Sequence, residues 1–345
     1  MRQALLAAPG RIQLRDDAAL PEPSPGELRV RGESVGICGS DLHALAGHHP
    51  FIELPVVPGH EAAGVVDAIG DGVEGFVVGD RVLLEPNLID GTCHYCRNGR
   101  YNLCEHLLVV GCTAGGALGE AFVAPAGRFH GIPNGMSMTE AAMVEPLSTA
   151  THATRIGGEL QGRTVAVLGA GSIGLLTMLT ARTSGAAAIA ITDPVASKRA
   201  LAVELGADLA LDPMESDMVQ RIRGELPWRP DVVFDCVASQ ASMDQAIGLA
   251  LKGGTVIVEG VPRNAVQVPL PLIQDRELRI QGTAMYTRED VERAIALIAG
   301  GDVPAGRLVT AEFPLDQAAE AFEAAGTGSE IKVHMKPQQA AATGR

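Results

Sequence analysis

The residues with the clearest chemical potential are a cysteine, a histidine and two glutamates in the first 145 positions. Cys38 comes first, followed by Gly59-His60-Glu61 and, much later, Glu145. Thiolate, imidazole and carboxylate are ligand types that zinc takes, and a catalytic zinc keeps one position open where a structural zinc is closed by four ligands. This scattered set therefore predicts a metal site that could act on a substrate.

A second group of candidate ligands is compact. Cys93-His94-Tyr95-Cys96 is followed shortly by Cys104, a spacing typical of a closed structural zinc site. Three clustered cysteines among six favour metal thiolates over disulfides. The remaining two, Cys112 and Cys236, fit neither zinc pattern and are expected to be small buried apolar residues.

A glycine-rich turn follows an apolar strand pattern and precedes a helical one. It reads Gly169-Ala170-Gly171-Ser172-Ile173-Gly174. The first glycine permits a tight turn, the second lets the backbone approach a pyrophosphate, and the third lets helix and strand pack closely. A diphosphate would bind to the amides of this loop and of the helix N-terminus. This context predicts a dinucleotide site.

An acidic residue completes the dinucleotide pattern. Asp193 follows the next predicted strand, where a carboxylate accepts hydrogen bonds from a ribose 2′-hydroxyl and repels a 2′-phosphate. The sequence therefore favours NAD over NADP. Lys198 could stack near the adenosine, or could lie on a solvated helix face.

Composition limits the partners. The chain has 345 residues, of which 46% are hydrophobic and 20% charged, so it can bury the cores of two ordinary domains. Its formal charge of −14 disfavours nucleic acid and anionic membranes, and makes small molecules the expected partners. We expect a cytoplasmic protein, because the apolar stretch at residues 4–8 is too short for a secretory leader.

The chain shows two successive patterns of predicted secondary structure. Up to about residue 130, short alternating runs such as 27–31 and 64–69 are separated by Gly and Pro and predict a barrel-like β domain. From Arg163 onward, strand patterns at 164–168, 187–192, 231–236 and 254–259 alternate with helical ones. That alternation predicts an α/β fold with a parallel sheet covered by helices. A further helix is expected over 289–299.

Taken in this order, the motifs resemble one enzyme family. Cys38, Gly59-His60-Glu61-x-x-Gly64-x5-Gly70-x-x-Val73, the cysteine cluster and the glycine loop are similar to those of the zinc-dependent medium-chain alcohol and polyol dehydrogenases, on the sorbitol and threonine dehydrogenase side. The resemblance implies a β-rich GroES-like catalytic domain over residues 1–150, completed by 286–345, and a Rossmann domain over 151–285. It places the active site in the cleft between them and implies a homodimer or homotetramer.

The resemblance also assigns roles to residues. Cys38 and His60 would bind the catalytic zinc, Glu145 would supply a third ligand directly or through water, and the neighbouring Glu61 would be able to swing onto the metal. Ser40 and His43 match a hydroxyl and a histidine that relay the alcohol proton.

The implied reaction transfers a hydride from a secondary alcohol or polyol to NAD and gives a ketone or aldehyde. A basic residue near the tail, Lys332, would approach the cofactor phosphates. The alternative is a zinc-stabilised NAD-binding scaffold or redox sensor without turnover, in which the relay residues would be idle.

Two departures from the family pattern stand out. Relatives have four cysteines in the structural site, and Asp90 occupies the place of the first here. Either a carboxylate joins Cys93, Cys96 and Cys104 or the site is degraded, and we favour the carboxylate because zinc accepts aspartate oxygen. In the sorbitol branch an Arg-Tyr pair ends the cofactor domain, whereas this chain has Met285-Tyr286. The lost guanidinium weakens the case for sorbitol itself.

Overall fold

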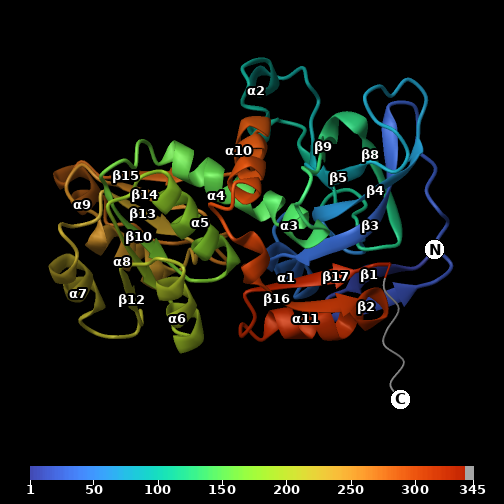
Figure 1. The fold of residues 1–345 in the computed structure, drawn as a ribbon. Coiled ribbons are helices and arrows are strands. Elements are labelled where there is room, and N and C mark those ends of the chain that lie inside the picture. The colour runs from blue at the N-terminus through green and yellow to red at the C-terminus, as the bar shows by residue number, and fades with distance from the viewer. Residues whose placement is uncertain (339–345) are drawn as a thin grey trace. The chain divides into compact units, whose positions relative to one another are not determined.

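The computed structural model describes residues 1–338 and divides them into two compact units (Figure 1). The first unit joins Met1–Glu145 to the C-terminal segment that begins at Thr287, and the second is Pro146–Tyr286. The first division falls at Glu145 rather than at residue 150, because the chain passes from one unit to the other inside helix α4 (Val144–Ile156).

The first unit is built on a seven-stranded sheet. Its main path runs in the order β16-β17-β3-β4-β5-β9, with β8 paired to β3. These strands are β3 (Glu27–Ile37), β4 (Glu61–Ile69), β5 (Arg81–Leu84), β8 (Ala121–Pro125), β9 (Phe129–Gly131), β16 (Val309–Pro314) and β17 (Lys332–Lys336). Strands from both chain ends therefore share one sheet, as the family resemblance implied.

Shorter elements complete this unit. Two small pairs are β1 (Gln3–Ala8) with β2 (Arg11–Arg15), and β6 (Asn87–Leu88) with β7 (Leu108–Val109). The helices are α1 (Gly39–Leu45), α2 (His94–Arg97), α3 (Met138–Ala142), α10 (Arg288–Ala299) and α11 (Ala318–Gly326), with 3-10 turns at Tyr101–Leu103, Ala126–Arg128, Ala305–Leu308 and Leu315–Gln317. Buried Leu28, Val30, Val66 and Phe322 belong to the core that these elements enclose.

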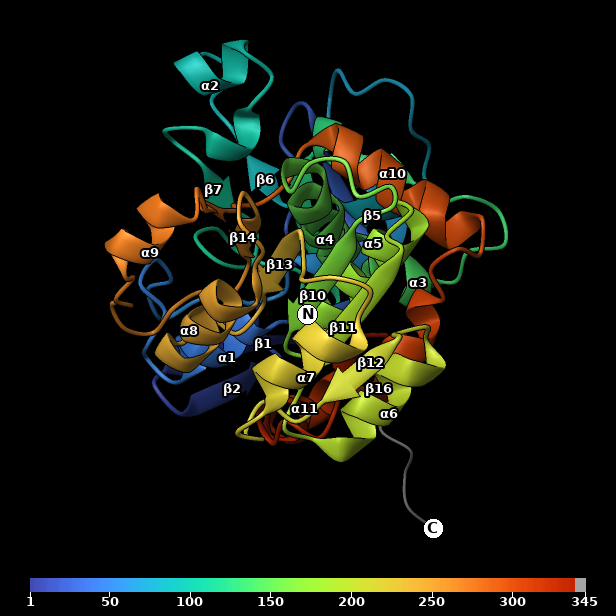
Figure 2. The same ribbon diagram turned by 90° about the vertical axis from the view of Figure 1, so that its left-hand side faces the viewer.

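The second unit contains a six-stranded parallel sheet in the order β12-β11-β10-β13-β14-β15 (Figure 2). Its strands are β10 (Thr164–Leu168), β11 (Ala188–Thr192), β12 (Leu209–Leu211), β13 (Val232–Asp235), β14 (Thr255–Val258) and β15 (Arg279–Gly282). Helices α5 (Ser172–Thr183), α6 (Ala196–Glu204), α7 (Met218–Glu225), α8 (Gln240–Leu249) and α9 (Leu270–Asp275) connect them. The predicted parallel sheet is confirmed.

The buried strands explain why their sequences could be recognised. All five residues of β10 and all five of β11 are buried, because helices cover both faces of a parallel sheet and its central strands become continuous apolar runs. The sequence did not predict β12 or β15. The first has only three residues, and the second is an exposed end strand without an apolar pattern.

Residues 164–181 contain no Asp, Glu, Lys or Arg. They form β10, the glycine loop and most of α5. Among residues 1–338, no helix combines the length and the apolar character needed to cross a bilayer.

Candidate active site

Pairing between β3 and β4 brings the first ligand set together. Cys38 directly follows β3 and caps the N-terminus of α1, while His60 and Glu61 stand at the start of β4. The antiparallel register places Gly36 opposite Glu61. One ligand atom from each of Cys38, His60 and Glu61 lies within 4.8 Å of the others. Residues more than twenty positions apart thus form one cluster.

Gly36 is part of this arrangement because it has no side chain. A Cβ at this position would clash with Oε2 of Glu61. The missing methyl group leaves the space that the Glu61 carboxylate occupies against β3. A larger residue at position 36 would push that carboxylate away from Cys38 and His60.

Lys332 on β17 holds the other oxygen of Glu61. Its Nζ lies 2.5 Å from Glu61 Oε1 and donates to the carbonyl of Ile37 at 3.2 Å, with 3% of the residue exposed. Burial lowers the pKa of Lys332, but Glu61 and Cys38 outweigh it and the pKa lies above its ordinary value. The structure thus places this ammonium on Glu61, and its contact with a cofactor phosphate stays a prediction.

Glu145 lies close to the cluster without belonging to its tightest part. It is buried at the start of α4, and its charge contributes to raising the pKa of Lys332. The mutually close ligand atoms come from Cys38, His60 and Glu61. Coordination by Glu145, directly or through water, therefore remains a prediction.

Two residues that the sequence did not single out flank the His60 ring. Cys112 Sγ lies 3.6 Å and Asp41 Oδ1 3.8 Å from its Nδ1. Burial by itself lowers the pKa of His60, but Cys112 and Asp41 outweigh it, so the pKa lies well above its ordinary value. An arriving metal ion would displace the ring proton, because imidazole binds metals in its neutral form.

The position of Asp41 has a local cause. Its Oδ2 accepts a hydrogen bond from the Cys38 amide at 2.9 Å, which forms part of a capping box at the start of α1. A carboxylate three residues after Cys38 was the sequence signal for this role. Cys112, expected to be a buried apolar residue, is half-buried and packs on the core while its sulfur faces His60.

Unsatisfied polar atoms show that the site suits a metal and a hydroxylic ligand. Glu61 Oε2 and Ser40 Oγ are buried, and within residues 1–338 neither has a hydrogen-bond partner. Buried polar atoms are normally paired. A sulfur, a ring nitrogen and a carboxylate oxygen form a zinc donor set. The residues present therefore fit zinc, and Ser40 lies two positions after Cys38 on α1.

Helix α1 carries both predicted relay residues. Ser40 and His43 are three positions apart, so they lie on the same side of the helix. His43 is half-buried, and its carbonyl accepts the amide of His48. This spacing is compatible with proton transfer from the buried hydroxyl toward the outside.

The second ligand set lies in the α2 lobe, residues 90–106. Ligand atoms of Asp90, Cys93, Cys96 and Cys104 all lie within 4.8 Å of one another. Oδ1 of Asp90 accepts the amides of Thr92 and Cys93 at 2.7 and 2.9 Å. These two bonds hold the carboxylate where the first cysteine of the family pattern would be.

His106 contacts Asp90 from outside the cluster. Its Nδ1 lies 2.6 Å from Asp90 Oδ2, and this contact holds the pKa of Asp90 well below its ordinary value. Asp90 is therefore ionised at neutral pH, as a metal ligand must be. Sequence reasoning missed His106, because nothing in its spacing marks it.

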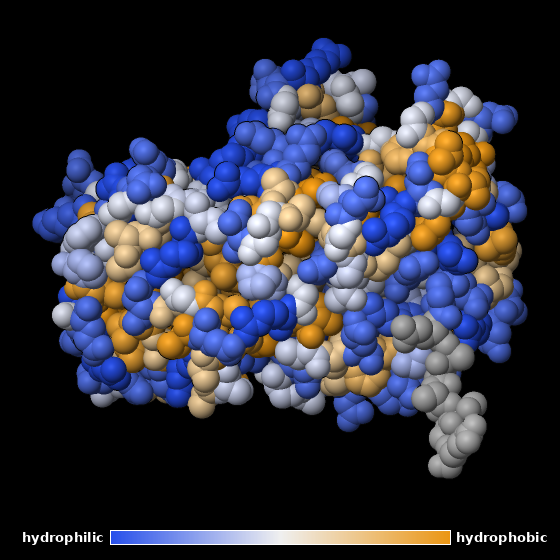
Figure 3. All heavy atoms as spheres, viewed as in Figure 1, coloured by the Kyte–Doolittle hydropathy of each residue, from blue (hydrophilic) through white to orange (hydrophobic). Residues whose placement is uncertain are grey.

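A buried carboxylate contacts this lobe through Tyr101. Glu85 accepts hydrogen bonds from Tyr101 at 2.7 Å and Arg128 at 2.8 Å, and lies 2.9 Å from His130 Nε2. Burial raises the pKa of Glu85, but the bonds with His130 and Tyr101 outweigh it and the pKa lies below its ordinary value. Hydrophilic residues cover most of the lobe in Figure 3. Metal and polar contacts therefore stabilise the lobe where little apolar surface does.

The glycine loop of the second unit has the geometry of a dinucleotide site. Gly169 has φ 96°, and Gly171 is the N-cap of α5. A Cβ on Gly174 would clash with the carbonyl oxygen of Gly169. Ser172 and Ile173 form the first turn of α5, whose amides face an approaching diphosphate.

Asp193 lies beside this loop. Its Oδ2 accepts the amide of Ala170 at 2.9 Å and its Oδ1 that of Val195 at 2.8 Å. Lys198 is largely buried in the first turn of α6. Arg199 donates to the carbonyls of Asp193 and Pro194, so a guanidinium that the sequence analysis did not weigh also lies here.

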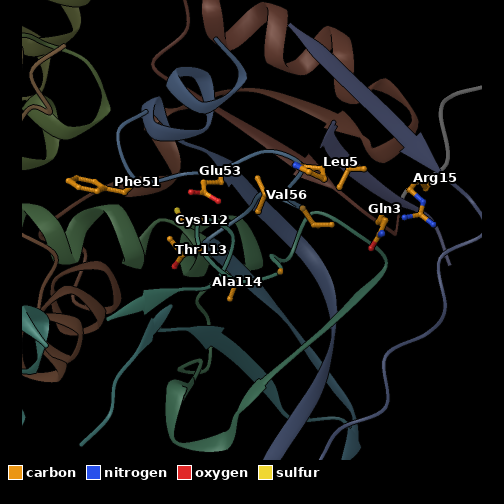
Figure 4. Close-up of a pocket in the computed structure, with 12 residues that line it drawn as sticks. Gln3, Leu5, Arg15, Phe51, Glu53, Val56, Cys112, Thr113 and Ala114 are labelled. Carbon is orange, nitrogen blue, oxygen red and sulfur yellow. The ribbon is translucent and has the colours of Figure 1, made fainter. Parts of the chain in front are cut away.

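A pocket of about 580 Å³ in the first unit reaches Cys112. Figure 4 shows Phe51, Glu53 and Thr113 near Cys112 and, at the other end, Gln3 and Arg15. Its lining combines apolar side chains with an acid, a base and neutral polar groups.

Comparisons with known proteins cover both units. A family model described as alcohol dehydrogenase GroES-like domain matches residues 24–134, and one described as zinc-binding dehydrogenase matches residues 172–300. Human sorbitol dehydrogenase is 35% identical over 336 residues, 95% of this chain and 93% of the relative. Grapevine L-idonate 5-dehydrogenase is 35% identical over 326 residues, 91% and 89% of the two chains. This protein belongs to the zinc-binding medium-chain alcohol dehydrogenases.

Solved structures agree with this family. A zinc-binding dehydrogenase from Sinorhizobium meliloti, described as bound to NADP, has a TM-score of 0.91 and 35% identity over 97% of this chain and 99% of that one. The 2R,3R-butanediol dehydrogenase of Bacillus subtilis has a TM-score of 0.90 and 28% identity over 98% and 99%.

Membership confirms several of the expectations from sequence. The fold is a GroES-like domain with a Rossmann domain, and the protein is a zinc-dependent polyol or alcohol dehydrogenase that binds NAD or NADP. Cys38, His60 and Glu61 form its catalytic zinc site, and Cys93, Cys96 and Cys104 its structural one. The protein is therefore an enzyme and not a scaffold without turnover.

For this dehydrogenase, we expect Asp90→Ala to lower thermal stability more than turnover. The variant loses a carboxylate at the structural cluster but leaves the residues around Cys38 unchanged. Loss of a metal ligand typically costs several kcal/mol, which for a domain of this size lowers Tm by roughly 5–10 °C. Calorimetry measures Tm, an NADH absorbance assay measures turnover, and elemental analysis measures zinc. Two zinc ions per wild-type chain are expected. One zinc in fully active wild-type protein would contradict the closed second site.

Proposed function

We propose that this dehydrogenase oxidises a secondary hydroxyl group of a polyol to a ketone and transfers the hydride to NAD. The observation that carries the proposal is the buried Ser40 hydroxyl, which is unpartnered within residues 1–338 and lies two positions after Cys38 of the Cys38, His60 and Glu61 cluster. Relatives named for sorbitol, L-idonate and 2R,3R-butanediol support a hydroxyl-rich substrate.

The residues divide the work of the reaction. Zinc held by Cys38, His60 and a carboxylate would supply the Lewis acidity that lowers the pKa of a hydroxyl group from about 16 to about 7. Ser40 accepts the hydroxyl proton, and His43 passes it outward, because an imidazole can bind and release a proton near neutral pH. Bound NAD would supply the hydride acceptor, so that one alcohol and one NAD⁺ would yield one carbonyl, one NADH and one proton.

Two features favour a polyol over a simple alcohol. The segment Glu145-Pro146-Leu147-Ser148 points to the polyol, sugar and threonine side of the family. The pocket beside Cys112 is larger than a short alcohol requires, and its Gln3, Arg15, Glu53 and Thr113 side chains offer donors and acceptors. Sorbitol itself is not proposed, because Met285 replaces the arginine of the sorbitol branch.

A substrate panel tests this proposal. Formation of NADH, followed by absorbance, is compared for hexitols, pentitols, butanediol and ethanol with zinc-loaded protein before and after chelation. We expect turnover with polyols that exceeds turnover with ethanol and is abolished by the chelator. Turnover that survives complete removal of zinc, or none across the panel, would overturn the assignment.

Asp193 supports NAD as the cofactor. Its carboxylate stands at the end of β11 beside the glycine loop, where it can accept a ribose hydroxyl and repel a 2′-phosphate. Arg199, the nearest guanidinium, is already bonded to two backbone carbonyls and lies 3.3 Å from Asp212. It is therefore not poised to bind a 2′-phosphate.

We expect Asp193→Ala to reduce the preference for NAD. Hydrogen bonds to a charged group contribute about 1.5–3 kcal/mol, so the ratio of kcat/KM for NAD to that for NADP falls by roughly 10–100-fold. Steady-state kinetics with both cofactors measure this ratio. Asp212→Ala is the control for Arg199, because it removes the carboxylate 3.3 Å from that guanidinium and leaves Asp193 in place. An unchanged ratio in Asp193→Ala would show that another residue selects the cofactor.

The outer edge of the Rossmann sheet supports a homodimer. Strand β15 ends the sheet, all four of its residues are exposed, and the segment leading to it carries exposed large apolar side chains. These are Val261, Val268, Leu270 and Leu272, and Ile280 adds an exposed apolar side chain on β15 itself. An unpaired, apolar edge strand is a template for pairing with a second chain, and a two-fold axis would bury the same edge on both copies.

The double variant Leu270→Glu/Ile280→Lys tests this edge. Charges there are expected to halve the mass of the assembly, because two copies would place like charges opposite one another. Light scattering after size-exclusion chromatography measures the mass. Val203→Lys is a control, because Val203 is an exposed apolar residue on α6. A wild-type monomer, or a double variant of unchanged mass, would reject this interface.

A further inference from the structure

A carboxyl group stands at the carboxyl edge of the Rossmann sheet and has no part in the chemistry described so far. Glu259 directly follows β14, and Cys236 directly follows β13. Thr177, on α5, donates a hydrogen bond to Glu259 Oε2 at 2.9 Å. Figure 2 shows β13, β14 and α5 around this edge. The group thus connects three elements that converge there.

One oxygen of the Glu259 carboxyl group is unpaired within residues 1–338. Within residues 1–338, Glu259 Oε1 is buried and has no hydrogen-bond partner, and the same is true of Thr283 Oγ1, just after the neighbouring strand β15. Buried polar atoms are normally paired with protein, water or a ligand. Two unsatisfied groups at adjacent strand ends indicate a surface shaped for something else to bind.

This edge lies at the dinucleotide loop. The amide of Cys236 donates to the carbonyl of Leu168 at 3.0 Å. A Cβ built on Gly169 would lie 3.8 Å from Cys236 Cβ. Cys236 therefore packs against the first glycine of the loop, and Glu259 stands one strand further along the sheet.

Sheet topology indicates which half of the cofactor meets Glu259. From β10 the chain first builds outward through β11 and β12, and then returns to β13 on the other side. Dinucleotides bind across the carboxyl ends of the strands at such a reversal, with one half on each side. Asp193 at the end of β11 belongs to the adenosine side. The ends of β13 and β14 therefore belong to the nicotinamide side.

The surroundings of Glu259 favour its neutral form. Burial raises its pKa to about 8, although the hydrogen bond from Thr177 opposes that shift. The titratable groups that act on it are the thiol of Cys236 and the carboxyl of Asp235, and α5 contributes the neutral Thr177. Asp235 is held by the amides of Val237 and Ala238. Glu259 thus changes charge within the pH range where dehydrogenases are assayed.

The two forms of the cofactor differ in charge at one place. The nicotinamide ring is positive in NAD⁺ and neutral in NADH, whereas the diphosphate is the same in both. We propose that Glu259 makes the choice between oxidised and reduced dinucleotide depend on pH, because its carboxylate attracts only the positively charged ring. The proposal rests on dinucleotide binding by this family and not on the identity of the alcohol.

Binding measurements on the zinc-loaded enzyme test the proposal. Kd for NADH is measured from its fluorescence and Kd for NAD⁺ by competition, between about pH 6.5 and about pH 9.5. We expect the ratio of Kd for NADH to Kd for NAD⁺ to rise severalfold with increasing pH, because the carboxylate attracts the positive ring of NAD⁺ and the protonated acid does not. In Glu259→Gln, which resembles the protonated acid, the ratio is expected to stay constant.

Two further variants keep the result interpretable. Glu225→Gln removes an exposed carboxylate on α7 and should follow the wild-type curve. Thr177→Val removes the donor to Glu259, so the midpoint of the wild-type curve should move to higher pH. This second readout remains available if Glu259→Gln does not fold. A pH-independent ratio in the wild type, or the same rise in Glu259→Gln, would overturn the inference. Failure to bind either cofactor form would instead refute the dinucleotide site.

Discussion

Replacing Cys38 with alanine is expected to remove the catalytic zinc and to lower kcat by at least about a thousandfold. The Lewis acidity lost with the metal contributes several kcal/mol to the hydride-transfer step. The remaining ligand atoms, from His60 and Glu61, do not make a complete site, and Glu61 is already bound to Lys332. Elemental analysis should find one zinc per chain in the variant and two in the wild type.

Cys112→Ala is the matched control for this experiment. Cys112 contacts the same histidine ring but lies outside the cluster of Cys38, His60 and Glu61. This variant is expected to keep both zinc ions and most of the turnover. If Cys112→Ala lost a zinc while Cys38→Ala retained it, the ligand assignment would have to be exchanged.

Ser40→Ala should lower kcat by roughly 100–1,000-fold with little change in zinc content. The buried hydroxyl has no protein partner within residues 1–338 and lies two positions after Cys38, so in the proposed relay its loss removes the first acceptor of the alcohol proton. The remaining activity is expected to increase with pH, because hydroxide then takes over the task of the hydroxyl group. The measurement is kcat as a function of pH, with zinc determined on the same samples.

Ser40→Thr separates the hydroxyl from the shape of the residue. This variant retains an Oγ at the same point of α1 and is expected to keep substantially more activity than Ser40→Ala. Equal losses in both variants would assign Ser40 a packing role. A kcat for Ser40→Ala within about twofold of wild type would remove Ser40 from the proton path.

Local patterns predicted the parts of the site that depend on neighbouring residues. The strand at 164–168 was found at its observed limits because a strand covered on both faces is a continuous apolar run. The glycine loop could be recognised because its steric requirements fall within six residues. The cysteine cluster is similarly local, since its four candidate ligands come from 15 consecutive positions, 90–104.

Contacts between residues far apart in the sequence could not be predicted from local patterns. Strand β17 lies beside β3 and brings the Lys332 ammonium to Glu61, 271 positions away, a contact that the sequence did not predict. Cys112 carried no recognisable signal, yet the fold brings its sulfur to His60. Asp41 and His106 were missed because isolated acidic and histidine residues are common on any surface.

The amino-acid sequence by itself determined the chemistry that this enzyme has available: thiolates and imidazole for zinc, a hydroxyl three residues from a histidine, and a glycine loop followed by an acid. Tertiary structure decided which carboxylate joins Cys38 and His60, which cation neutralises it, and that Glu259 meets Cys236 and Thr177 at the strand ends. The physical reason is that ligand type and strand period are properties of short segments. Which strand lies beside which depends on the packing of the whole core, and no short segment contains that information.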